Sequence, residues 1–370
     1  MDLIKYYSNK KVIEHLIRIA KDRELVVNYG EKGFGKRPDI LNFNHDVVEL
    51  ARQGVTSFHF SEERWSNALL LKPGMEKKKL DDLRNSWDLM LDVDGPFEYS
   101  RITSYFLVEA LKFHDIKNIS VKFSGNKGFH IGIPAEAFPD KVNNLETKNL
   151  FPEGPKVIAS YLKEMIREFL TSKILENKNI EILAKELERK KEDLIRENKF
   201  DPFTIVDIDT ILISNRHVFR APYSYHEKSG LISMPINYND ILTFSKESAK
   251  IENVKFDVGF LGKYEKNEAS NLIIQAFDWA SKNKPKENKE IIIKDYDIPK
   301  KAISEEYFPP CIKLLVKGVE RDGRKRGLFI LISFLKGVGY NYEEMERFLL
   351  EWNKRNYEPL RESYIKSQLI

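Results

Sequence analysis

The chain has 370 residues and a mass of 43.4 kDa, which is more than one ordinary hydrophobic core supports, so two domains are expected. Hydrophobic residues make up 42% of it, and no apolar run reaches the roughly eighteen residues of a membrane span, which excludes an ordinary transmembrane helix. A net charge of +4 is small, so nucleic-acid binding would have to come from local basic patches.

The cysteine content restricts the metal chemistry. Cys311 is the only cysteine, so neither a disulfide nor a cysteine-based zinc or iron–sulfur site can be built within this chain. Any metal must therefore bind to oxygen or imidazole ligands. Lys and Glu are abundant and Gln is rare, which is typical of thermophilic proteins. The first twenty residues read as an amphipathic helix without the apolar block of a signal peptide, so a cytoplasmic protein is expected.

In chain order, residues 1–281 alternate short β-rich runs with helical segments, which predicts an α+β domain. Residues 86–94 (SWDLMLDVD) are predicted to form a strand and residues 103–115 a helix. Residues 118–123 (NISVKF) and 129–134 (FHIGIP) follow as two strands, joined as a hairpin by the tight loop SGNKG.

The rest of the chain is predicted from the same patterns. A helical insertion covers about residues 155–199, with one helix over 155–175 and a second, very polar helix over 181–198. Residues 201–213 and 230–236 return to strand character. A linker over 282–301 then leads to a small helical domain over 302–370, whose apolar residues recur with a helical period.

Carboxylates interrupt the apolar strand at 86–94. Strand alternation puts Trp87, Leu89, Leu91 and Val93 on one face and Asp88, Met90, Asp92 and Asp94 on the other. Asp92 and Asp94 are about 7 Å apart at Cα, so both can reach a pair of divalent cations held about 4 Å apart. Alone, the pattern is as typical of a turn followed by a helix cap.

A Gly-bounded loop, SGNKGFH, follows the next strand. Its small residues let backbone N–H groups approach phosphate oxygens, and Lys127 adds a positive charge beside Ser124, Asn126 and His130. The alternative is an ordinary β-turn that uses Gly for positive φ and leaves the lysine in solvent.

A second acidic pair, Asp207 and Asp209, lies about 115 residues after the first and shares one strand face by the same alternation. Donors suited to a triphosphate come next in the chain: Arg216, Arg220, His226 and Lys228. The alternative is that the two arginines pair with surface acids and that His217 is a satisfied edge residue.

Taken in order, these motifs resemble the catalytic subunit of the archaeo-eukaryotic primases. That family has a D-x-D strand, an S-G-x-x-G-x-H loop, a strand with a third aspartate, and a basic residue before P-x-S-x-H-x-K-[ST]-G. The corresponding segments here are LDVDG, SGNKGFH, DID and RAPYSYHEKSG, and SFHFSEERW is similar to the segment before the acidic strand. The resemblance implies a primase catalytic core with a mixed or antiparallel sheet and flanking helices.

The resemblance also implies residue roles. Asp92 and Asp94 would bind two Mg²⁺ or Mn²⁺ ions, with Asp209, or otherwise Asp207, as the third acidic ligand. The nucleotide phosphates would be bound by Ser124, Asn126, Lys127, His130, Arg220, His226 and Lys228. Asp88 matches nothing in the motif and is expected to be structural. The zinc-binding insertion of many relatives is missing, so no zinc is expected.

The segment YFPPCIKLLVKGVERDGRKRGLFILISFLKGVG resembles the start of the C-terminal domain of the primase large subunit. In that family four cysteines hold an iron–sulfur cluster. This chain has a cysteine at only one corresponding position, Cys311, so no cluster is expected unless the native chain continues beyond Ile370. Cys311 would then be a buried small apolar residue. The resemblance implies contacts to template or initiating-nucleotide phosphates by Lys317, Arg321, Arg324, Lys325 and Arg326. A solvated basic loop is the alternative.

The expected function is that of a DNA-dependent primase for replication, a nucleotidyltransferase that uses NTPs or dNTPs on single-stranded DNA. Other replisome proteins are expected partners, and a separate large subunit would be unnecessary. Three alternatives stay open: a primase-polymerase of repair or of a mobile element, a non-catalytic nucleic-acid-binding scaffold, and a two-metal nuclease.

Overall fold

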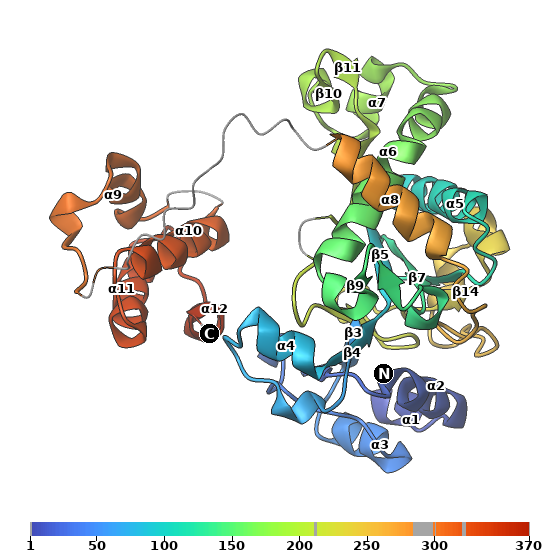
Figure 1. Cartoon of the computed structure of the whole chain (residues 1–370), viewed down its shortest axis with the longest axis horizontal. Helices are drawn as coiled ribbons and strands as arrows, with labels where there is room; N and C mark the ends of the chain where they lie inside the picture. Colours follow the sequence, from blue (N-terminus) through green and yellow to red (C-terminus); the bar gives the residue numbers. More distant parts are fainter. Residues whose placement is uncertain (1, 211–212, 284–298, 300, 320–322, 370) are drawn as a thin grey trace. The chain divides into compact units, whose positions relative to one another are not determined.

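The protein is described by a computed structural model that covers residues 2–210, 213–283, 299, 301–319 and 323–369 (Figure 1). The chain forms two compact units, Met1–Pro285 and Lys286–Ile370. The linker expected at 282–301 lies almost entirely outside the described residues. Among the helices that the structure describes, none is both long and apolar enough to cross a membrane.

A five-stranded sheet forms the centre of the first unit. Its strand order is β12-β5-β7-β6-β14, and every neighbouring pair is antiparallel. The strands are β12 (Asp207–Ile208), β5 (Leu89–Asp94), β7 (Phe129–Ile133), β6 (Ser120–Phe123) and β14 (Pro235–Ile236). The α+β class with an antiparallel sheet, and the hairpin over 118–134, are confirmed.

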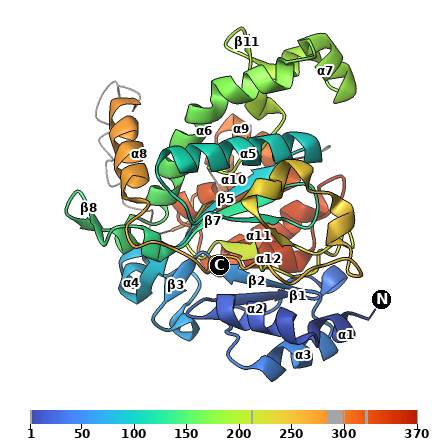
Figure 2. The same ribbon diagram turned by 90° about the vertical axis from the view of Figure 1, so that its right-hand side faces the viewer.

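Long helices cover one face of this sheet. They are α5 (Phe97–Phe113), α6 (Glu153–Leu175) and α8 (Ser270–Asn283), and Figures 1 and 2 show them on the same side. Leu89, Leu91 and Val93 of β5 point into the core beneath these helices, as the alternation predicts. The predicted strand 86–94 is in fact two strands, since β4 (Arg84–Trp87) ends before Asp88 and pairs with β3 (Glu63–Trp65).

The other side of the sheet meets a second core. A three-stranded antiparallel sheet, β1 (Leu25–Asn28), β2 (Ser57–Ser61) and β13 (Val218–Arg220), packs there with α1 (Leu3–Tyr7), α2 (Lys10–Ala20) and α3 (Asn44–Arg52), as Figure 2 shows. The amphipathic helix expected over the first twenty residues is thus split, because the side chain of Asn9 caps α2. Met90, on the opposite face of β5, belongs to this second core.

Shorter elements complete the first unit. These are α4 (Lys77–Leu83), β8 (Lys141–Val142), β9 (Leu145–Glu146), α7 (Ile180–Glu186), β10 (Ile195–Arg196), β11 (Lys199–Phe200), and the 3-10 turns η1 (Gly30–Lys32), η2 (Ala68–Leu70), η3 (Ala135–Ala137), η4 (Thr147–Leu150), η5 (Lys191–Leu194), η6 (Pro202–Thr204), η7 (Tyr238–Thr243) and η8 (Lys246–Ala249).

The polar helix predicted over 181–198 is wrong beyond its first turns. The helix α7 ends at Glu186, and β10 and β11 form a hairpin instead. Glu188, Glu197 and Asn198 have φ values of 53°, 50° and 62°, which a helix cannot contain. Positive φ at both Glu197 and Asn198 is typical of a type I′ turn, whose twist matches the right-handed twist of the strands in a tight hairpin. Residues 181–198 contain few apolar side chains, so a long helix here would have little apolar surface to pack against the rest of the protein.

The strand predicted over 201–213 is also mostly wrong. Asp201 caps the 3-10 turn η6 with its side chain, and only Asp207 and Ile208 pair with β5. Residues 211 and 212 lie outside the described part of the chain. Of the strand predicted over 230–236, only Pro235–Ile236 pairs within the sheet, and Ile232 forms an isolated bridge with Tyr225.

The second unit is helical, with η9 (Glu305–Tyr307), α9 (Pro310–Val316), α10 (Arg324–Gly337), α11 (Tyr342–Lys354) and α12 (Glu362–Leu369). Its core gathers apolar side chains from all four α-helices around Trp352, Leu331 and Leu335. Asn341 and Glu344 form a reciprocal cap at the start of α11. Cys311 is exposed, so the expectation of a buried small residue is wrong.

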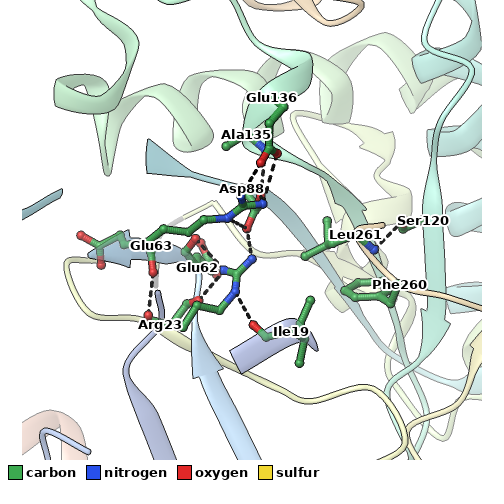
Figure 3. Close-up of polar contacts among 12 residues, drawn as sticks. Ile19, Arg23, Glu62, Glu63, Asp88, Ser120, Ala135, Glu136, Phe260 and Leu261 are labelled. Atoms are coloured by element: carbon green, nitrogen blue, oxygen red, sulfur yellow. Dashed lines mark hydrogen bonds and ion pairs between the residues drawn. The ribbon is translucent and has the colours of Figure 1, made fainter. Parts of the chain in front are cut away.

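An ion network links β3 to segments that lie next to β1, β5 and β7 (Figure 3). Asp88 is fully buried and accepts hydrogen bonds from Arg23, from Arg64 at 2.7 Å and from the backbone N–H of Ala135 at 2.8 Å. Arg64 also pairs with Glu136. Because Asp88 has these partners, its role is structural. This was expected, because Asp88 matches no position of the primase D-x-D motif.

Candidate active site

A row of polar side chains crosses three strands of the central sheet. Asp92 of β5 stands opposite His130 of β7, which stands opposite Lys122 of β6. Directly opposed residues in antiparallel strands point to the same face, so the three side chains share the face turned away from α5 and α6. The Nε2 atom of His130 lies 3.4 Å from Oδ1 of Asp92.

Asp94 ends β5 at the edge of this row and is exposed. The loop 124–128 lies against this strand end, which requires glycine at position 128. A Cβ atom on Gly128 would be 2.1 Å from the carbonyl oxygen of Val93 and 3.1 Å from Oδ1 of Asp94. The close approach brings the loop to the acidic end of β5.

The two residues of the second acidic pair have different side-chain partners, although Asp207 stands opposite Asp94 in the pairing of β12 with β5. Asp207 is exposed and forms an ion pair with Lys163 of α6 at 3.1 Å. Asp209 lies beside Asp92, because its backbone N–H donates to the Asp92 carbonyl oxygen at 3.0 Å. Its negative charge also contributes to raising the pKa of Asp92. Asp209 therefore lies with Asp92, whereas Asp207 has a cationic partner of its own.

The acidic residues concentrate negative charge. Burial, then the charge of Asp94, and further that of Asp209, raise the pKa of Asp92 to about 7. A hard divalent cation would relieve this repulsion, and carboxylate oxygens are the ligands that Mg²⁺ and Mn²⁺ prefer. Within the described ranges, no three His, Cys, Asp or Glu side chains already converge closely enough to hold a metal ion. The donor chemistry fits a divalent cation, and the side chains would have to close around it.

The loop 124–128 is held in shape by Ser124. Its hydroxyl accepts from the N–H of Gly128 at 3.2 Å, and its own N–H donates to the Gly128 carbonyl oxygen at 2.9 Å. Asn126 is half-buried and Lys127 is exposed at the tip. A Cβ on Gly125, whose φ is +101°, would lie 2.8 Å from Cβ of His226. The loop thus packs directly on the segment that carries His226.

The segment around Arg220 completes the cluster. Arg220 of β13 stands opposite His59 of β2, and its Nη2 donates to Glu227 at 3.0 Å. Burial and the nearby Arg220 lower the pKa of His226 to about 4, so this histidine is neutral at pH 7. Lys228 is exposed. The predicted phosphate-binding residues are therefore brought together from two separate stretches of sequence, 124–130 and 220–228.

His130 also has an unused hydrogen-bonding atom. The residue is only 7% exposed, and its buried Nδ1 has no partner among the described residues. Burial and the positive charges of Lys122 and Arg220 hold the pKa of His130 well below its usual range, so the ring is neutral. A neutral imidazole has one N–H donor, so His130 can donate through Nε2 or through Nδ1, but not through both.

A comparison with family models shows what this region is similar to. Residues 98–238 match the model described as DNA primase small subunit. This part of the chain is therefore similar to DNA primase small subunits. The matched range contains the loop 124–128, Asp209, and the segment from Arg220 to Lys228, and it begins four residues after Asp94. The match supports nucleotidyl transfer of the primase or polymerase kind.

Comparisons with individual proteins give further similarities. The chain is 24% identical over 363 residues to an uncharacterized protein of Methanocaldococcus jannaschii, covering 87% of this chain and 73% of that protein. This coverage exceeds the length of the first unit, so the similarity extends into the helical unit. The solved polymerase domain of Mycobacterium tuberculosis Ligase D in complex with DNA has 14% identity and a TM-score of 0.41, covering 76% of this chain and 88% of that one.

Several residues around the primase motifs were missed by sequence reasoning. His59 contacts Ser57, whose hydroxyl donates to Glu227, and burial holds the pKa of His59 well below its usual range. Although burial alone would raise it, Arg220 and Ser57 lower the pKa of Glu227 to about 2. Strand alternation in SFHFS could have shown that His59 lies on the polar face with Ser57 and Ser61.

Lys122 is a second residue that was missed, and it is fully buried. Its Nζ donates to Ser233 at 2.8 Å, and burial lowers its pKa well below the usual value. In the sequence it stands between Val121 and Phe123, and a lysine at an inward strand position was the available signal.

Arg216 and His217 have protein partners next to the primase motifs. Arg216 pairs with the buried Glu24, which also accepts from Arg37 at 3.0 Å. Arg216 thus pairs with an acid, but that acid is buried and is not the surface acid of the alternative. His217 Nδ1 lies 2.7 Å from Oε1 of Glu62. Burial alone would lower the pKa of His217, but the hydrogen bond to Glu62 raises it.

The basic residues of the helical unit are placed as follows. Lys317 follows α9 and is exposed, and Arg326 is exposed on the first turn of α10. Arg324 pairs with Glu358 at 2.7 Å, and the Nζ of Lys325 lies 5.4 Å from the centre of the Tyr364 ring. Arg321 lies outside the described residues. Arg324 is thus already engaged within its own unit.

Proposed function

We propose that the chain is a DNA-dependent primase that synthesises short primers on single-stranded DNA during replication. The observation that carries the proposal is the row from Asp92 to His130 across β5 and β7, onto which the loop 124–128 and the segment 220–228 fold. Carboxylates thereby lie beside groups that can donate hydrogen bonds to a phosphate, as nucleotidyl transfer requires.

The acidic end of the row would hold the metals. Asp92, Asp94 and Asp209 are the proposed ligands, and Asp207 is set aside because it pairs with Lys163. Two bound Mg²⁺ or Mn²⁺ ions would supply charge neutralisation for the attacking 3′-oxygen and for the leaving pyrophosphate. Apolar packing under β5 keeps the carboxylates in place, since Leu91 and Val93 on the other face are fully buried.

The other end would bind the triphosphate. Ser124, Asn126 and Lys127 offer a loop with backbone and side-chain donors, and His130 offers its neutral ring. Arg220, held by Glu227, and the neutral His226 add donors from the opposite side, with Lys228 at the rim. These groups orient the α-phosphate toward the acidic end, so the gain in rate comes mainly from positioning and charge.

The helical unit is proposed to act like the C-terminal domain of a primase large subunit in the same chain. Lys317, Lys325 and Arg326 present positive charge for template or initiating-nucleotide phosphates, and Arg324 would have to exchange its contact with Glu358. The similarity to the M. jannaschii protein extends into this unit, so it is not confined to the first unit. Such an enzyme would act on DNA in the cytoplasm without a separate large subunit, beside other replisome proteins.

The test is de novo synthesis by the purified full-length chain. Single-stranded DNA, labelled NTPs or dNTPs and Mg²⁺ or Mn²⁺ are incubated without a primer, beside the variant Asp92→Asn/Asp94→Asn. New oligonucleotides that disappear in the variant are expected. Extension only with an added primer would instead indicate the primase-polymerase of repair or mobile elements, and no synthesis in either setting would contradict the proposal.

A further inference from the structure

An exposed aromatic ring stands next to the proposed triphosphate site. Phe34 is 61% exposed, and its ring makes an edge-to-face contact with His59 at 5.3 Å between centroids. His59 is the residue opposite Arg220 in the β2–β13 pair. Phe34 therefore lies one side chain away from the cluster of Arg220, Glu227 and His226, and most of its surface faces solvent.

The loop that carries Phe34 has a fixed backbone. Residues 28–35 fold back on β1 by a bridge between Asn28 and Phe34, and the N–H of Gly35 donates to the Val27 carbonyl oxygen at 2.8 Å. A Cβ on Gly35 would lie 2.9 Å from the Val27 side chain, so only glycine lets the loop return this closely. The ring is thus presented by a closed turn, which lowers the entropy cost of binding to it.

The loop is also basic. Lys32 and Lys36 flank Phe34 at two residues on either side, and both are exposed. An exposed aromatic ring between lysines is the combination that binds single-stranded nucleic acid, because the ring stacks on a base and the lysines approach the phosphates. A protein partner would more often require a wider apolar surface, and the two neighbours of Phe34 in the chain are glycines.

We propose that Phe34 is a stacking platform for a base of the single-stranded DNA template, with Lys32 and Lys36 contacting the adjacent phosphates. The proposal rests on the proposed function, because it takes the cluster around Arg220 as the nucleotide site that the template must pass. It adds a DNA-binding element on the first unit that no sequence motif indicated.

The test measures binding alone, so it does not depend on synthesis. A fluorescently labelled oligodeoxythymidine is titrated with the full-length chain in EDTA, without nucleotides, and anisotropy is followed. Phe34→Ala is expected to weaken binding by about tenfold, while Phe34→Trp keeps or strengthens it. Phe43→Ala is the matched control, because Phe43 is also 61% exposed and also contacts a histidine ring, that of His45, but lies at the start of α3.

A second oligonucleotide separates stacking from general damage. On an abasic oligonucleotide of the same length, wild type and Phe34→Ala should bind equally, because no base is left to stack. Lys32→Ala/Lys36→Ala should flatten the dependence of log Kd on log salt by about 0.7 for each phosphate that the two lysines neutralise in wild type. The inference is overturned if Phe34→Ala binds oligodeoxythymidine like wild type, or is weakened by the same factor on the abasic strand.

The failure of this inference and that of the proposed function are distinguishable. If Asp92→Asn/Asp94→Asn abolishes synthesis and Phe34→Ala binds DNA normally, the primase proposal stands and the platform is refuted. If Phe34→Ala weakens binding to bases but wild type synthesises nothing, the DNA-binding element stands and the primase proposal is refuted.

Discussion

The imidazole Nε2 of His130 lies 3.4 Å from Oδ1 of Asp92, across the antiparallel pair of β7 and β5. The contact joins the proposed phosphate-binding end of the site to its acidic end. A change at either residue is therefore expected to affect both nucleotide binding and metal binding.

The acidic pair after η6 gives a direct test of the metal ligands. Asp209→Asn should lower primer synthesis by at least about a hundredfold, because the variant has no carboxylate at this position beside Asp92. Asp207→Asn should keep near-normal synthesis, since Asp207 is exposed and pairs with Lys163. Steady-state synthesis rates at saturating Mn²⁺ and nucleotide compare the two variants, and the reverse order would assign the third ligand to Asp207.

When the protein binds a nucleotide, the imidazole of His226 should take up a proton. The free protein holds the pKa of this ring at about 4, below the ordinary 6.5, and a bound triphosphate would raise it. The complex then binds more protons than the free protein between the two values, so affinity should rise as pH falls through this window. Calorimetric titration at pH 6 in two buffers of different ionisation enthalpy measures the uptake.

The control for this proton is His226→Gln. It removes the titrating ring, so the buffer dependence should shrink to the part that the nucleotide phosphates themselves contribute. Equal proton uptake by wild type and His226→Gln would show that the proton goes elsewhere.

Contact between the two phosphate-binding segments can be tested at Gly125. Gly125→Ala places a Cβ 2.8 Å from Cβ of His226, at a φ of +101°, so KM for the nucleotide should rise several-fold. Gly54→Ala is matched to it, because Gly54 has a φ of +94° and nothing within 4 Å of its Cβ. Both variants carry the backbone penalty, which is about 1 kcal/mol, and only Gly125→Ala should change KM. A similar KM in both would argue against the contact.

The buried ion network predicts a large stability effect. Asp88→Ala leaves Arg23, which is 2% exposed, without its buried carboxylate, and should destabilise the first unit by about 3–5 kcal/mol. The exposed pair of Lys10 and Glu14 is the comparison, since Glu14→Ala should change stability by less than about 0.5 kcal/mol. Calorimetric unfolding of both variants at one pH measures the difference, and a small effect of Asp88→Ala would mean that water replaces the carboxylate.

Sequence periodicity predicted the centre of the fold better than its edges. The faces of β5, the hairpin of β6 and β7, and the helices of the second unit follow from apolar periods that burial then stabilises. The segments 181–198 and 201–213 were wrong because their structure depends on local turns. Positive φ at Glu188 and Asn198, and the side-chain cap at Asp201, are weak signals in a single sequence.

The candidate site was predictable where motifs have fixed spacing. Asp92, His130 and the segment from Arg220 to Lys228 were found in this way, and the structure places them around one face of the sheet. Lys122, His59 and Glu227 were not found, because each has a partner far away in sequence. Lys122 donates to Ser233, His59 stands opposite Arg220, and Ser57 donates to Glu227. Only the tertiary fold brings such residues together.

Strand β5 contributes Leu91 to one hydrophobic core and Met90 to the other. If only one of these two cores opens, the other still holds β5, so Asp92 and Asp94 keep their positions. Backbone amides of β5 should exchange with deuterium only through the opening of the whole first unit, and the carboxylates should keep their mutual placement up to the temperature at which that unit melts.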